Sequence, residues 1–299
     1  MNENKKVAWL YVVLTVIASA VAVVFQYILL NDYAEASTGL YPRDAMTPVA
    51  FYVFLAIAAV LVCMSSIMLR KDVIPTEPKR FTWYNGVVSA CAAIAVIVSG
   101  AKFFKDSGLF DGMASFKTIN KLELAGACMA FFAGAYFVSI LLLGKKTNNI
   151  VPLLSFFVVL WTLFYLLNIC FDKNVLVNSP AKALRQLSLI FLMIFQLLES
   201  RALIGKSKPR LYFVFSLLSV VFMSASVFPE LIMWYKGDRV LTLDATYLIY
   251  FSVIVVYVLT RAISFAIYSD GEAVYLQSKK NEQRNKQKDV LFTSDDDSE

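Results

Sequence analysis

Two charged side chains inside apolar stretches could do chemistry together. Glu199 and Arg261 lie in separate apolar runs of the chain, each about 7 to 11 Å from the same side of a membrane if the runs are spanning helices. A lone charge in hydrocarbon is costly, so the matching depth predicts that they form an intramembrane charge pair. An internal anion or cation site built from the same two groups is the functional alternative.

A second set of polar side chains lies near the other side of the predicted membrane, and it consists of Glu230, Arg185, Asn168 and Gln26. Glu230 follows Pro229, whose ring removes a backbone donor and can kink a helix. Together the four residues predict an outward-facing polar vestibule that binds a ligand. The simpler interpretation is that they are boundary residues wetted by lipid headgroups.

Several kinds of enzyme site are not indicated. The chain has no histidine, which removes His-based acid–base catalysis and His metal ligation. It also lacks a Gly-rich phosphate loop, a paired acidic loop motif and a GxSxG nucleophile motif. Its 4 cysteines form no CxxC pair, and we expect them to be small core residues. We therefore predict no cofactor, no metal and no catalytic residues.

The composition is that of a membrane protein. Hydrophobic residues make up 59% of the 299 residues and charged residues 17%, with a mean hydropathy of +0.65, whereas a soluble domain is about half apolar and a quarter charged. The formal charge of +6 is spread over the connections between apolar runs, so no nucleic-acid partner is expected.

The apolar runs predict an all-α, polytopic transmembrane bundle of about eight helices, since a helix needs about 20 apolar residues to cross a bilayer. The first run could also be a signal peptide, but it continues far beyond an h-region of about 7–15 residues, so we expect a retained helix. The sixth run is the least regular, because polar and charged residues interrupt it. The expected segments are 7–30, 48–69, 82–101, 122–143, 150–171, 183–204, 211–234 and 243–268.

The basic residues predict the orientation. More Lys and Arg fall on the connections that share a side with both termini than on the other connections, and cytoplasmic loops are enriched in these residues. We therefore expect cytoplasmic N and C termini and a multi-pass protein of the cell membrane. The lysines of the loop 102–121 oppose this orientation.

Small residues divide the predicted membrane domain. Ala and Gly are concentrated in residues 1–145, and Gly126, Ala130 and Gly134 recur every four residues, which lets helix backbones approach closely. We expect the first four helices to form a tight bundle. Residues 146–268 form a bulky apolar second half, and 269–299 a charged, partly disordered cytoplasmic tail.

Three functions fit these features. Our prediction is a non-enzymatic protein, such as a sensor, scaffold or accessory subunit, that binds membrane lipids or a partner protein through its last four helices or its tail. The first alternative is a transporter or permease for a small or amphiphilic solute, which needs a continuous polar path. The second is a lipid-modifying membrane enzyme, which needs clustered carboxylates, Ser or Tyr at one interface.

Overall fold

The structure is a computed structural model that describes residues 3–35, 40–42, 45–69, 83–106, 121–143, 150–171, 179–204, 206, 208–237 and 245–268. The predicted tail, 269–299, lies outside the described residues.

Eight helices in this part of the chain are long and apolar enough to cross a membrane. They are α1 (Glu3–Ile28), α2 (Met46–Met68), α3 (Trp83–Asp106), α4 (Lys121–Leu143), α5 (Ile150–Phe171), α6 (Pro180–Leu203), α7 (Pro209–Tyr235) and α8 (Ala245–Tyr268). A short π-helix, η1 (Leu29–Tyr33), continues α1. The predicted all-α bundle is confirmed, including the irregular sixth segment.

Proline residues begin two of the helices. Pro180 and Pro209 occupy the first positions of α6 and α7, where the missing backbone N–H costs no helical hydrogen bond. A third proline, Pro229, lies inside α7. Because α6 and α7 carry most of the buried polar side chains described below, their starting points fix the depth of those groups.

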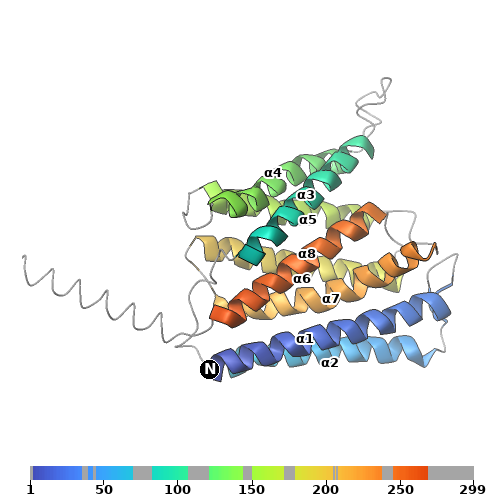
Figure 1. Cartoon of the computed structure of the whole chain (residues 1–299). Helices are drawn as coiled ribbons and strands as arrows, with labels where there is room; N and C mark the ends of the chain where they lie inside the picture. The colour runs from blue at the N-terminus through green and yellow to red at the C-terminus, as the bar shows by residue number, and fades with distance from the viewer. Residues whose placement is uncertain are drawn as a thin grey trace, which may run out of the picture.

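The helices form three tiers around α7 (Figure 1). The middle tier holds α6, α7 and α8; α1 and α2 rest on it from one side, with α1 lying along α7, and α3, α4 and α5 cover it from the other. We call the side where α1 begins and α8 ends the terminal side, and the other the opposite side. α7 is buried over most of its length, as expected of a central helix.

The first four helices pack differently from the expected single bundle. α3 and α4 do pack closely: a Cβ placed on Gly100 would lie 2.7 Å from Ala130 Cβ, and one on Gly134 would lie 2.6 Å from Ile97 Cγ1. However, α1 and α2 pack mainly on α7, whereas α4 continues onto α5. Small residues permit close approach but do not select the partner helix.

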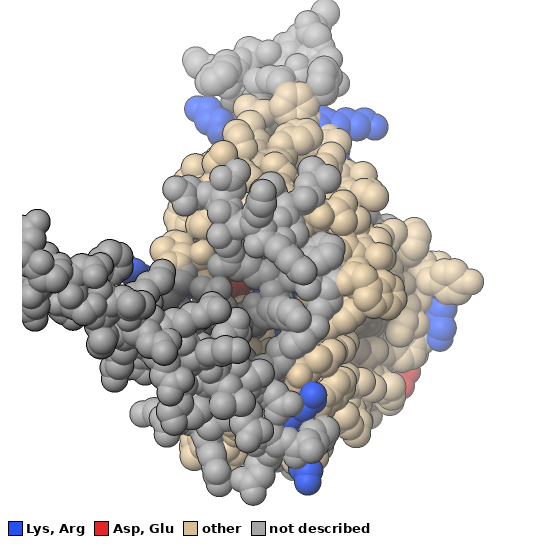
Figure 2. Space-filling model, turned by 60° about the vertical axis from the view of Figure 1, so that its left-hand side comes forward, with Lys and Arg blue, Asp and Glu red and all other residues tan. Residues whose placement is uncertain are grey.

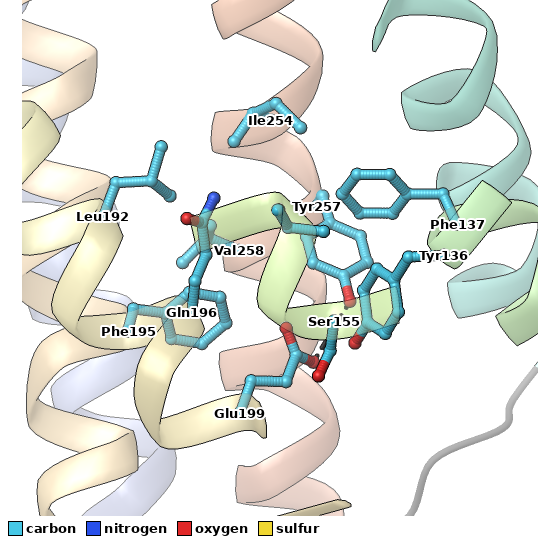
Figure 3. Close-up of a pocket in the computed structure, with 11 residues that line it drawn as sticks. Tyr136, Phe137, Ser155, Leu192, Phe195, Gln196, Glu199, Ile254, Tyr257 and Val258 are labelled. Carbon is cyan, nitrogen blue, oxygen red and sulfur yellow. Dashed lines mark hydrogen bonds between the residues drawn. The ribbon is translucent and has the colours of Figure 1, made fainter. Parts of the chain in front are cut away.

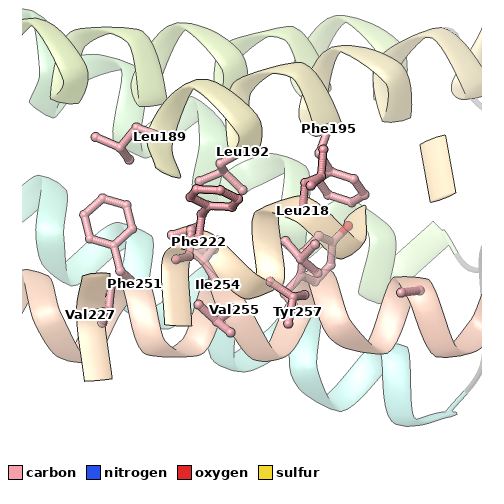
Figure 4. Close-up of a cluster of buried hydrophobic side chains, with 14 of the residues drawn as sticks. Leu189, Leu192, Phe195, Leu218, Phe222, Val227, Phe251, Ile254, Val255 and Tyr257 are labelled. Carbon is pink, nitrogen blue, oxygen red and sulfur yellow. The ribbon is translucent and has the colours of Figure 1, made fainter. Parts of the chain in front are cut away.

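An apolar layer crosses the centre of the middle tier. Figure 4 shows side chains of α6, α7 and α8 facing one another there, among them Leu189, Leu192, Phe222, Phe251 and Ile254. Each of them is buried. Close packing of this kind excludes water, so the layer separates the terminal half of the tier from the opposite half.

The outer surface of the bundle is apolar, with α2 the least buried of the spanning helices. The cysteines belong to this surface: Cys63, Cys91, Cys128 and Cys170 are free and exposed. The expectation that they are core residues is therefore wrong. A cysteine is small and apolar enough to face lipid as readily as protein, so its presence in an apolar run does not decide between the two.

Candidate functional site

The first candidate site is the Glu199–Arg261 pair. Arg261 Nε lies 2.7 Å from Glu199 Oε1, and the two side chains are only 5% and 4% exposed. The pair joins α6 to α8 on the terminal side, as the matching depths predict. At 2.7 Å the contact is a charge-assisted hydrogen bond, which lowers the cost of burying both charges.

Three tyrosines surround this pair. Tyr257 OH donates to Glu199 Oε1 at 3.1 Å, and Tyr136 and Tyr212 lie within electrostatic range of Arg261. We call these five residues the Glu199 centre. The sequence analysis did not identify the tyrosines. A signal was present for Tyr136 and Tyr257, because both lie well inside their runs and not at the membrane boundary, where tyrosine is most common.

A small cavity lies beside the Glu199 centre. Figure 3 shows the hydroxyl ends of Tyr136 and Tyr257 turned toward the Glu199 carboxylate, with Ser155 beside it. The volume open to the centre of a water molecule is about 10 Å³, which is room for about one water. Nearby, Thr162 Oγ1 donates to Gln196 Oε1 at 2.8 Å. The centre can therefore hold a water molecule but not an organic solute.

The second candidate site is built around Arg185 on α6. Its Nη2 lies 3.0 Å from Glu230 Oε1 of α7 and donates to the Ser226 backbone oxygen at 2.6 Å. Ser188 Oγ and Ser226 Oγ are 3.2 Å apart. We call Arg185, Glu230, Ser188 and Ser226 the Arg185 centre. It lies on the opposite side, about 8 Å from the start of α6.

The Arg185 guanidinium is incompletely bonded. Its Nε and Nη1 have no hydrogen-bond partner within the described chain. Solvent cannot supply one without a rearrangement, because the residue is only 1% exposed. A buried donor without an acceptor costs about 1–3 kcal/mol, and more when it is charged. This residue therefore has three N–H donors, one on Nε and two on Nη1, that no described residue accepts.

Gln26, another residue of the predicted vestibule, hydrogen-bonds to Tyr41 and, among the described residues, makes no hydrogen bond to Arg185 or Glu230. Gln26 Nε2 donates to Tyr41 OH at 3.2 Å. Burial raises the pKa of the Tyr41 phenol above its usual value, and charge interactions with Tyr52 and Glu230 raise it further. Gln26 therefore contacts Tyr41, which lies within electrostatic range of Glu230.

Asn168 does not join this group. It is half-buried on α5, and among the described residues it makes no hydrogen bond to Arg185 or Glu230. Tyr41, which provides the link to Gln26, was missed because it lies in a connection between spanning segments. No helical periodicity places such a residue relative to the bundle.

An apolar groove lies at the same level as the Arg185 centre. Its volume is about 250 Å³, and Tyr52 and Leu187 on its wall are partly exposed on the lipid-facing surface. Three helices supply its lining, which consists of Tyr52, Leu55, Ala56, Ala183, Leu184, Leu187 and Phe222. Ala183, Leu184 and Leu187 are close neighbours of Arg185 on α6, so the groove and the centre share one stretch of this helix.

The two centres are far apart on α6. At 1.5 Å per residue, Arg185 and Glu199 are separated by about 21 Å along the helix. The apolar layer of Leu189, Leu192 and their neighbours lies between them. The polar groups therefore form two separate sites in this conformation, without a polar connection along the described part of α6.

No metal site accompanies either centre, since the described residues contain no group of three or more Cys, Asp or Glu placed to hold a metal ion. A comparison of the chain with models of protein families, with curated proteins and with solved structures finds no match. The function is therefore argued from the two centres and the groove alone.

Proposed function

We propose that this chain is a non-enzymatic, lipid-binding protein of the cell membrane, with both termini in the cytoplasm. The groove between α2, α6 and α7 carries the proposal. A sensor or accessory subunit of this kind binds an amphiphile from the surrounding bilayer and changes its contact with a partner.

The groove suits an acyl chain. Apart from the Tyr52 hydroxyl its lining is hydrocarbon, and at this depth its surroundings are lipid tails rather than water. Its occupant therefore enters sideways from the bilayer, and bulk and shape decide which chain fits. A volume of about 250 Å³ accommodates part of one chain, so we assign the groove to a single acyl chain of a membrane lipid.

Transport is less well supported. A carrier commonly holds its solute near the membrane midplane between two gates. Here Leu192, Phe222 and Ile254 fill the midplane of the middle tier, and the cavity beside Glu199 has room for about one water. The two polar centres lack the continuous path that this alternative needs.

Catalysis on lipids is also less well supported, although Glu199, Tyr136, Tyr257 and Ser155 do come together near one side of the membrane. A general base must reach the proton that it abstracts. The Glu199 carboxylate is occupied by Arg261 and Tyr257 and enclosed by protein. This cluster therefore fits a structural role better than a catalytic one.

The basic residues of the full sequence support the proposed orientation, because more of them fall on the connections that share a side with both termini. Figure 2 brings forward the side that lies at the left in Figure 1 and shows Lys and Arg at the margins of the described surface, with little Asp or Glu. Among the described residues, the terminal side carries Lys5, Lys6, Arg201, Lys206, Lys208 and Arg210, and the opposite side carries Lys102, Lys105, Lys121, Lys182 and Lys236. Cytoplasmic positions are enriched in such residues.

Orientation can be tested with two exposed lysines. In a cysteine-free background, Lys236→Cys on the opposite side should react with an impermeant maleimide added to intact cells. Lys206→Cys on the terminal side should react only after the cells are opened. Labelling of residue 206 in intact cells would overturn the orientation.

The lipid-binding proposal can be tested with a photoreactive phosphatidylcholine whose acyl chain carries a diazirine. After illumination in nanodiscs, we expect cross-links to concentrate on α2 and α6. Ala56→Trp, which fills the groove, should lower their yield about fivefold or more. Ile57→Trp is the matched control, because Ile57 is exposed on the same helix and does not line the groove. Cross-links spread evenly around the bundle, with equal yields for both variants, would contradict the proposal.

A further inference from the structure

Among the buried charged side chains described, Arg185 has the most nitrogen atoms without a hydrogen-bond acceptor. Nη2 serves both Ser226 and Glu230, while Nε and Nη1 have no acceptor in the described part of the chain. Arginine has five N–H donors in a fixed plane. The N–H groups on Nε and Nη1 can therefore bind an acceptor of complementary shape.

The charge of the surroundings favours an anion. Lys182 and Arg185 are both buried on α6, with the Glu230 carboxylate as their counterpart among the buried charged side chains described at this end. Lys182 has interactions of its own and adds positive potential. Planar, charged N–H donors match the oxygen atoms of a carboxylate or a phosphate.

Arg185 lies on the same stretch of α6 as three residues that line the groove. Leu184 and Leu187, which flank Arg185 in the sequence, line the groove. Tyr41 interacts electrostatically with Tyr52 on the groove wall and with Glu230 in the centre. Arg185 lies about 8 Å inside α6, and basic pockets between transmembrane helices can bind lipid headgroups.

We infer that Arg185 binds the oxyanion of an anionic lipid headgroup whose acyl chain occupies the groove lined by Tyr52, Leu187 and Phe222. This inference rests on the proposed lipid-binding function and adds the headgroup class to it. Binding includes a rearrangement of the Arg185 side chain or of the groups that cover it, because the residue is 1% exposed without ligand.

The decisive measurement compares lipid retention by the full-length protein. Protein from nanodiscs with equal amounts of phosphatidylglycerol and phosphatidylcholine is released into mild detergent, and the bound lipids are counted by native mass spectrometry. We expect phosphatidylglycerol to be retained in preference to phosphatidylcholine. In Arg185→Lys the charge opposite Glu230 remains and the extra planar donors are lost, so this preference should fall about tenfold.

A second variant guards against simple misfolding. Glu230→Gln removes the carboxylate that competes with an external oxyanion, so the preference for phosphatidylglycerol should rise. A purely structural Arg185–Glu230 pair predicts the reverse: both variants would lower stability, and neither would change lipid selectivity. Unchanged selectivity in both folded variants would overturn the inference.

Two further arms separate the possible outcomes. Inorganic phosphate, titrated into phosphatidylcholine nanodiscs, should stabilise the wild type less than phosphatidylglycerol does; an equal effect of free phosphate would overturn the assignment to a lipid headgroup.

The groove variant Ala56→Trp tests the binding of the acyl chain. If it abolishes cross-linking while all proteins retain both lipids equally, the proposed function stands and the headgroup inference fails. If cross-linking is unaffected, the proposed function itself fails.

Discussion

The two buried charge centres use the same residue types and differ in how completely they are bonded. At the Glu199 centre, helices α4, α6, α7 and α8 supply the ion pair and three tyrosines. The charged pair itself is bonded, since Glu199 accepts from Arg261 and Tyr257, whereas Tyr212 OH has no hydrogen-bond partner in the described chain. At the Arg185 centre, the guanidinium keeps unmet donors on Nε and Nη1, and Arg185 shares a stretch of α6 with residues that line a lipid-accessible groove. A saturated pair stabilises one arrangement of helices, whereas an unsaturated one is prepared for a ligand. Burial and charge alone do not separate these roles; the hydrogen-bond inventory does.

The largest expected effect comes from breaking the saturated pair. Glu199→Gln or Arg261→Gln leaves one buried charge without its partner, which typically costs about 3–5 kcal/mol. The double variant leaves no unpaired buried charge and should be at least as stable as either single one. The free energy of unfolding can be followed by titration from a mild detergent into sodium dodecyl sulfate.

This cycle has a clear opposite result. If the decreases in the free energy of unfolding of the two single variants add up in the double variant, the side chains do not act as a pair. Arg201→Gln is a suitable control, because Arg201 is exposed near the same end of α6 and its removal should change stability by less than about 0.5 kcal/mol.

A smaller loss is expected from the unsaturated pair. Glu230→Gln deprives Arg185 of its carboxylate, but Nη2 keeps the Ser226 oxygen, and the glutamine oxygen can still accept a hydrogen bond. We expect a loss of about 2 kcal/mol in detergent without anionic lipid. Added phosphatidylglycerol should reduce this loss, because its headgroup replaces the missing charge. A loss equal to that of Glu199→Gln, and insensitive to lipid, would remove the distinction between the centres.

Two tyrosines of α8 provide a matched test of hydrogen-bond support. Tyr257 OH donates to Glu199 Oε1, whereas Tyr250 OH is buried and has no partner in the described structure. Tyr257→Phe should therefore cost about 1.5–3 kcal/mol, the range for a hydrogen bond to a charged group. Tyr250→Phe should be neutral or slightly stabilising, because it removes an unsatisfied hydroxyl. Equal losses in thermal unfolding would show that the Tyr257 contact contributes nothing specific.

The helices could be predicted from sequence because the bilayer imposes one simple requirement, an apolar run of sufficient length. The Glu199–Arg261 contact could be predicted for a related reason: depth follows from counting residues, and isolated charges at one depth have few other partners. The same reasoning placed Arg185 and Glu230 at a common level.

The relative positions of the helices could not be predicted in this way. Ala and Gly in the first half indicated close packing, but α3 and α4 realise it while α1 packs on α7. Partner choice depends on the rotation of each helix about its axis, and nearly uniform apolar faces leave that rotation undefined. Tyr136 was missed for this reason, since it contributes through neighbours on other helices, whereas Tyr41 was missed because it lies in a connection.

The smallest expected effect tests the independence of the two centres. The apolar layer of Leu189, Leu192 and Phe222 separates them, and they lie about 21 Å apart on α6. The stability changes caused by mutations at the two centres should therefore be independent. Combining Arg185→Lys with Tyr257→Phe should give the sum of the separate stability losses within about 0.5 kcal/mol. A coupling above about 1 kcal/mol would mean that α6 transmits a change at one centre to the other.

Repeating the cycle with phosphatidylglycerol present extends the test to the lipid-bound state. A coupling that appears only with this lipid would identify α6 as the element that carries a binding signal toward the terminal side.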